Sequence, residues 1–202
     1  MNDSYTRLPE GYTPLPPGKI ANVVTDLEMF AAPPLRAERN AGTLTLVRWE
    51  RPPLGEYRTL FRRVGAPYLW FSRLELDDAG LAAVIHNPDS EIYVARSGAE
   101  VVGWFELDFD QAGECELRFF GLVPEAIGSG AGRWLMNRVI ERAWARPIRR
   151  FWLHTCTLDH PDAVDFYRRS GFVPFRREIE ITDDPRLNGL LPRESAPHVP
   201  II

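Results

Sequence analysis

A glycine-rich turn between a predicted strand and a predicted helix constrains this chain more than any other feature. Residues 114–123 have the pattern of a strand and residues 132–145 that of a helix, and the turn between them holds Gly128, Gly130 and Gly132. Glycine lets the backbone approach a ligand closely, and the following helix adds the positive end of its dipole. The spacing matches neither the Walker A motif nor the dinucleotide-binding fingerprint. The turn is therefore either a phosphate-binding loop or a flexible surface turn.

Strands and helices are expected to alternate along most of the chain. Further strands are predicted at residues 43–49, 91–96, 100–108, 150–158 and 175–181, and further helices at 53–64, 77–86 and 161–170. The strands on either side of Ser97-Gly98 form a hairpin. Strand–helix–strand segments late in the chain require parallel neighbours with right-handed crossovers. We therefore expect an α/β (α+β) domain with a mixed sheet.

Prolines interrupt the first 42 residues and predict an irregular N-terminal arm. Within it, residues 19–29 have an ambiguous period, and the run Val23-Val24-Thr25 favours a strand. We expect this arm (residues 1–42) to pack on a domain that spans residues 43–182. Residues 183–202 would then form a C-terminal extension.

The composition excludes several classes of protein. Hydrophobic residues make up 45% and charged residues 26% of the 202 residues, as in ordinary globular proteins. No apolar run approaches the roughly 18 residues of a membrane span, and the first residues lack the apolar core of a secretory signal. We therefore expect a cytoplasmic protein that does not bind membranes. The net charge of −4 argues against nucleic acid as a partner, and the two cysteines and four histidines show no metal-ligand spacing, so no metal is expected.

Two motifs together resemble those of the GNAT acetyltransferase superfamily, over about residues 43–182. The pyrophosphate loop of that family reads Gln/Arg-x-x-Gly-x-Gly/Ala, and residues 127–132 follow it as Ile-Gly-Ser-Gly-Ala-Gly. The second motif, Asn-x-x-Ala-x-x-Phe/Leu-Tyr-x-x-x-Gly-Phe, corresponds to residues 160–172. Two positions depart from the family pattern: Ile127 replaces a polar or basic residue, and His160 replaces the asparagine. Arg133 could supply the charge that is missing at position 127.

The resemblance implies a GNAT-type fold, with a mostly antiparallel central sheet, a splayed parallel pair of strands and helices on both faces. It also implies acetyl-CoA as co-substrate, with its thioester in the splay between the strands that contain Val123 and Arg150. The pantetheine arm would bond to the backbone of the first strand, where the Leu122 N–H would polarise the thioester carbonyl. The implied cofactor-binding residues are Phe120, Leu122, Val123, Gly128, Ser129, Gly130, Ala131, Gly132 and Arg133.

Acetyl transfer to an amine needs a base for the amine and an acid for the leaving thiolate. By the resemblance, Tyr167 occupies the position of the family's thiolate-protonating tyrosine, although a core aromatic residue would suit the same helix face. An ungapped count back from Gly130 places Glu116 where histone-acetylating members carry their catalytic glutamate. The alternative for Glu116 is a solvent-facing side chain paired with Arg118.

Other residues are candidates for the base or for the acceptor pocket. Glu106, on the neighbouring strand, is a second possible base. His154 is a further candidate because histidine is a common general base, although a structural histidine fits its strand as well. The aromatic residues Tyr68, Trp70 and Phe71 would either wall the acceptor pocket, where they could hold a cationic amine by cation–π contact, or pack in the core.

These features predict an N-acetyltransferase that moves an acetyl group from acetyl-CoA to a primary amine in a direct ternary complex. A small-molecule acceptor is favoured over a protein, and a homodimer is possible. The alternative is a non-catalytic GNAT-fold module that binds acyl-CoA as a sensor or interaction protein.

Overall fold

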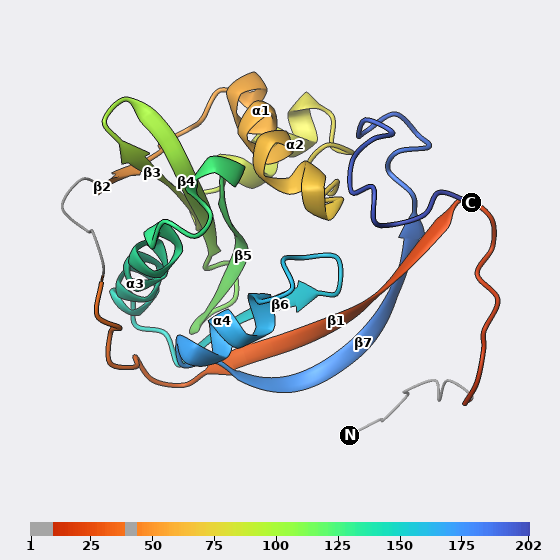
Figure 1. Ribbon diagram of the computed structural model, residues 1–202. Coiled ribbons are helices and arrows are strands. Elements are labelled where there is room, and N and C mark those ends of the chain that lie inside the picture. Colours follow the sequence, from red (N-terminus) through yellow and green to blue (C-terminus); the bar gives the residue numbers. More distant parts are fainter. Residues whose placement is uncertain (1–9, 39–43) are drawn as a thin grey trace.

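A computed structural model of the protein describes residues 10–38 and 44–202 (Figure 1). Its strands are β1 (Lys19–Met29), β2 (Leu44–Arg48), β3 (Ser90–Ser97), β4 (Glu100–Asp108), β5 (Glu114–Leu122), β6 (Arg150–Cys156) and β7 (Val173–Asp183). Its α-helices are α1 (Leu54–Gly65), α2 (Asp78–Ile85), α3 (Ala131–Trp144) and α4 (Ala163–Arg169), and the short 3₁₀ turns are η2 (Ala66–Tyr68) and η3 (Pro124–Ala126). The predicted elements are all present, with ends that differ by one or two residues.

The strands form one sheet in the order β2-β3-β4-β5-β6-β1-β7. All neighbours are antiparallel except β5 and β6, which are parallel and pair only over Glu114↔Arg150, Cys115↔Phe151 and Glu116↔Trp152. Beyond Glu116 the two strands separate, although β5 continues to Leu122. The predicted fold class, a mostly antiparallel sheet with a splayed parallel pair, is confirmed.

Strand β1 shows that part of the N-terminal arm belongs to the sheet. The predicted strand at residues 19–29 is confirmed, and it lies between β6 and β7, antiparallel to both. Leu27 and Met29 on this strand are buried in the hydrophobic core. The boundary predicted between residues 42 and 43 lies outside the described residues, so the division into arm, domain and extension stays a prediction.

The helices lie in two groups, α1 with α2 and α3 with α4 (Figure 1), and a hydrophobic core lies under each group. One lies under α3 and α4 and contains Leu135, Phe151 and Tyr167. The other lies under α1 and α2 and contains Phe61 and Trp104. The splay between β5 and β6 thus lies in a sheet that carries a packed layer on each face.

The segment after β7 is held together by a buried ion pair. Arg186 is 3% exposed, and its guanidinium group donates to the Asp184 carboxylate and to the carbonyl oxygens of Ser195, Ala196 and Val199. This segment also places Leu191 in the core under α1 and α2. The segment after β7 therefore packs against the same core as α1 and α2.

Candidate active site

Glu116 lies at the point where β5 and β6 separate. It is 6% exposed, its Oε2 is 3.1 Å from Arg118 Nε, and its Oε1 is 3.8 Å from His154 Nδ1. Burial raises the pKa of the Glu116 carboxyl from 4.5 to about 7; Arg118 opposes this shift and Asp108 adds to it. Burial is the largest of these effects, so the pKa is raised even though Arg118 is close. A carboxyl of this kind exchanges protons near neutral pH.

The structure brings His154 next to Glu116, a contact that the sequence alone did not predict. His154 is on β6, opposite Asp26 of β1, and its side chain is half exposed. The Glu116 carboxylate, by contrast, is almost entirely covered. His154 therefore connects the buried carboxyl group with solvent.

Glu106, the second candidate base, is engaged in a different interaction. It is 1% exposed, and its carboxylate accepts a 2.8 Å hydrogen bond from the Tyr57 hydroxyl and a further one from Arg73. Arg73 also donates to the Tyr57 oxygen at 3.3 Å. Because both oxygens of Glu106 are bonded, it is less suited than Glu116 to accept a proton from an amine.

Tyr167 of α4 packs against β5, one of the two strands that border the splay. Its buried ring packs edge-on against Phe120 of β5, with ring centroids 6.3 Å apart. Burial and, to a lesser extent, the nearby Asp159 charge raise the Tyr167 pKa well above its usual range. The phenol therefore keeps its proton at every physiological pH.

Trp70 covers the splay on the side of α1 and α2. Its Nε1 donates a 2.8 Å hydrogen bond to Asp159, in the loop after β6, and its ring lies against Gly121 of β5. Asp159 is fixed in turn by the Thr155 hydroxyl at 2.7 Å and by the Cys156 N–H at 2.9 Å. Trp70 therefore spans the two walls of the splay.

The other two aromatic candidates lie close to Trp70 in the chain. Tyr68 is a ring neighbour of Trp70 at 6.2 Å, and burial followed by the Asp159 charge raises its pKa. Phe71 is half-buried, and its carbonyl accepts the N–H groups of Leu74 and Glu75. Of the three predicted aromatic residues, Trp70 is the one that contacts both β5 and the loop after β6.

The hydrogen bonds at the end of β5 show which backbone groups are already bonded within the protein. The Val123 N–H donates to Val102 O at 3.0 Å, and the Val123 carbonyl accepts from Ala126 at 2.9 Å. Because N–H groups alternate sides along a strand, those of Phe120 and Leu122 point toward the splay. Phe120 and Leu122 are therefore suited to bond the pantetheine arm through their N–H groups, whereas the Val123 N–H is already bonded within the protein; all three contacts stay predictions.

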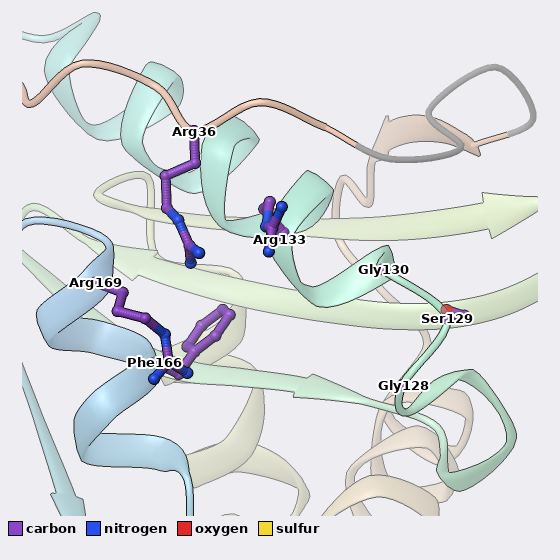
Figure 2. Close-up of a pocket in the computed structure, with 7 residues that line it drawn as sticks. All are labelled: Arg36, Gly128, Ser129, Gly130, Arg133, Phe166 and Arg169. Carbon is purple, nitrogen blue, oxygen red and sulfur yellow. The ribbon is translucent and has the colours of Figure 1, made fainter.

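The glycine loop lines a pocket of about 380 Å³ (Figure 2). Gly128 and Gly130 have φ angles of +81° and +94°, which favour glycine. The N–H groups of Ser129 and Ala131 are engaged by Ala126 O at 3.4 Å and by the Ser129 hydroxyl at 3.2 Å. The N–H groups of Gly128, Gly130 and Gly132 donate no hydrogen bond within residues 10–38 and 44–202. These three N–H groups can therefore bind a ligand.

Two of the arginines that line this pocket were not predicted from the sequence. The lining residues are Arg36, Gly128, Ser129, Gly130, Arg133, Phe166 and Arg169. Arg133 was expected, whereas Arg36 comes from the N-terminal arm and Arg169 from α4. Arg169 lies within the second GNAT motif, but no local signal in the sequence marks Arg36.

The two cysteines are free thiols. Burial, followed by the charge of Asp159, raises the pKa of Cys156 to about 12, and burial raises that of Cys115 as well. Neither thiol forms a thiolate at neutral pH. In the part of the chain that the structure describes, no group of three or more His, Cys, Asp or Glu side chains is placed to hold a metal ion, and no helix is long and apolar enough to cross a membrane.

A model of the "Acetyltransferase (GNAT) family" matches residues 46–172 of the chain. No protein of curated function matches the sequence. The family match includes both motifs, Glu116 and Tyr167.

Solved structures share the fold at low sequence identity. A GCN5-related N-acetyltransferase from Sphaerobacter thermophilus has a TM-score of 0.58 at 18% identity, over 81% of this chain and 52% of that one. An aminoglycoside acetyltransferase from an uncultured soil metagenomic sample has a TM-score of 0.53 at 16% identity, over 64% of this chain and 88% of that one. The ribosomal-protein-S18-alanine N-acetyltransferase of Escherichia coli has a TM-score of 0.54 at 14% identity, over 70% of this chain and 94% of that one. The chain thus spans about half of the Sphaerobacter structure, and these likenesses concern the fold alone.

Proposed function

The chain belongs to the GNAT acetyltransferase family, and from this premise we propose that it transfers an acetyl group from acetyl-CoA to the primary amine of a small molecule. The observation that carries the proposal is the buried carboxyl of Glu116 at the apex of the splay, with its pKa raised to about 7. A base with a pKa near the working pH is both ionised in part and strong enough to accept a proton.

Glu116 would take a proton from the incoming ammonium group, directly or through one water molecule. The amine would then attack the thioester carbon with its free electron pair. His154, 3.8 Å from the carboxyl group and half exposed, would pass the proton to solvent.

On the cofactor side, Leu122 and Tyr167 would act on opposite ends of the reacting bond. The Leu122 N–H faces the splay and would donate to the carbonyl oxygen as negative charge develops there. Tyr167 would donate a hydrogen bond from its hydroxyl to the sulfur atom as the C–S bond breaks. Because its pKa is strongly raised, it would stabilise the thiolate chiefly as a donor that retains its proton.

The residues of the glycine loop fit acetyl-CoA. Gly128 and Gly130 adopt backbone conformations with positive φ, and a Cβ placed on Gly128 would extend into open space on the loop surface. Among the described residues, the N–H groups of the three glycines have no hydrogen-bond partner, and Gly130 directly precedes α3, whose dipole favours a phosphate at this end. Arg133 adds a positive charge at the same place.

Direct transfer is supported by the two cysteines, because neither is ionised at neutral pH and so neither is suited to carry the acetyl group. A small acceptor is supported by Trp70, whose bond to Asp159 covers the splay on the α1–α2 side. The aminoglycoside enzyme and the ribosomal-protein enzyme are named for acceptors of different size, so the shared fold does not decide between them.

Thiol release from acetyl-CoA, measured across a panel of primary amines, tests the proposal. The panel includes aminoglycosides, polyamines, amino acids and peptides with a free N-terminus. We expect turnover with at least one amine and its loss in Glu116→Gln. Tight CoA binding without turnover on any amine would favour the alternative, an acyl-CoA-binding module, and would overturn the proposed activity.

A further inference from the structure

Three arginines from three separate segments line the pocket beside the glycine loop (Figure 2). Arg36 belongs to the N-terminal arm, Arg133 to the first turn of α3, and Arg169 to the end of α4. None of the seven lining residues is acidic. The pocket therefore collects positive charge from parts of the chain that are far apart in sequence.

These charges act on one another. The pKa of Arg36 is lowered by partial burial and then by the charges of Arg133 and Arg169. Like charges held in one pocket repel each other, and a bound anion removes that repulsion. A group with two negative charges matches such a site better than a carboxylate, because guanidinium groups bind phosphate oxygens with charge-assisted hydrogen bonds.

The backbone around Arg36 is fixed by contacts with α3. The buried side-chain amide of Asn137 donates to Arg36 O at 2.8 Å and to the Glu38 carboxylate at 2.8 Å. Arg133 donates to Ala37 O at 3.1 Å, and Arg138 pairs with Glu38. The arm is therefore attached to α3 over residues 36–38, and Arg36 is held at the pocket.

The pocket has two ends. Figure 2 shows Gly128 and Ser129 at one end, Arg36 and Arg169 at the other, and Arg133 between them. The loop N–H groups would bind the diphosphate of CoA, and Arg36 and Arg169 lie away from the loop. Besides its diphosphate, CoA carries a phosphate ester on the ribose 3′ oxygen.

We propose that Arg36 and Arg169 bind the 3′-phosphate of CoA, so that the N-terminal arm, which lies before the segment matched by the family model, completes the cofactor site. This inference rests on the proposed use of acetyl-CoA. Its consequence is discrimination: the protein should prefer CoA to 3′-dephospho-CoA, which keeps the diphosphate and the pantetheine.

Calorimetric titration of the full chain with CoA and with 3′-dephospho-CoA tests the inference. We expect the wild-type protein to bind CoA at least about tenfold more tightly than 3′-dephospho-CoA. The double variant Arg36→Gln and Arg169→Gln should lose most of this preference, while its affinity for 3′-dephospho-CoA stays within about twofold of wild type. Arg36 and Arg169 line the pocket rather than the core, so the double variant should keep the wild-type melting temperature.

The control is Arg168→Gln, on the same turn of α4. Its side chain is 61% exposed and pairs with Asp165, and it does not line the pocket; the preference for CoA should persist in this variant. Equal binding of CoA and 3′-dephospho-CoA by wild type would overturn the inference and leave the proposed function intact. If the double substitution weakens the binding of CoA and of 3′-dephospho-CoA by an equal factor, the inference is likewise overturned and the proposed function is left intact. Failure to bind either ligand would contradict the proposed function itself.

Discussion

Replacing Glu116 by glutamine removes the proton-accepting oxygen and keeps the shape of the side chain. The carboxyl pKa is raised from 4.5 to about 7 by burial, so wild-type kcat/KM should fall about tenfold per pH unit below pH 7 as the carboxylate takes up a proton. The variant should lack that inflection. Near pH 8 its kcat/KM should be lower by about 10²- to 10⁴-fold, the usual contribution of a general base. Above the pKa of the acceptor amine the difference should shrink, because the amine loses its proton in solution.

The same substitution has a consequence for stability that does not depend on catalysis. A pKa raised in the folded state means that the charged carboxylate is disfavoured by folding, and the cost is present only above the unfolded pKa. At about 1.4 kcal/mol per pKa unit, the shift corresponds to about 3 kcal/mol. Glu116→Gln should therefore increase the free energy of unfolding progressively between about pH 4.5 and pH 7, and by a constant amount above pH 7. Arg118 keeps Asp108 as a partner at 3.0 Å, so its charge is not orphaned in the variant.

Thiol-release kinetics from pH 5.5 to 9.5 and denaturant unfolding over the range from pH 4 to 9 measure the two effects. Glu114→Gln is the matched control, since Glu114 lies two residues earlier on β5 and pairs with Arg150; its variant should keep the wild-type pH profile. A wild-type pH–rate profile in Glu116→Gln would refute the role of Glu116 as base. Equal stability of wild type and variant at every pH would refute the raised pKa.

Three further outcomes are expected. Tyr167→Phe should lower kcat by about 10²-fold with little change in CoA affinity or melting temperature, and full activity would make Tyr167 a packing residue. Gly130→Val should weaken CoA binding by about tenfold or more in calorimetry, because φ of +94° strains a branched side chain, and unchanged affinity in a folded variant would exclude the loop from binding. Arg186→Met should lower the free energy of unfolding by about 3–5 kcal/mol, since it leaves the buried Asp184 carboxylate without its partner; a change below about 1 kcal/mol would show that the pair does not hold the extension.

The catalytic candidates show how far sequence reasoning reaches. Glu116 is predicted by its distance from the glycine loop and Tyr167 by its place in the second motif; Glu116 lies where β5 and β6 separate, and Tyr167 packs on Phe120 of β5. Glu106, on the neighbouring strand, is the second candidate base, but the structure joins it to Tyr57 and Arg73. Those partners are far from Glu106 in the chain, so no local pattern predicts the ion pair.

The sequence by itself determined the elements of the sheet and helices, the glycine loop and the family. Periodicity, turn residues and short motifs are patterns that extend over a few residues, so they can be recognised without knowledge of the rest of the chain. The tertiary structure alone decided that β1 enters the sheet between β6 and β7, that His154 meets Glu116, and that Arg36 reaches the pocket. These contacts join residues far apart in the chain. Burial and the charges of such distant neighbours set the pKa of Glu116 and the positive charge of the pocket, and both arise only when the whole chain is packed.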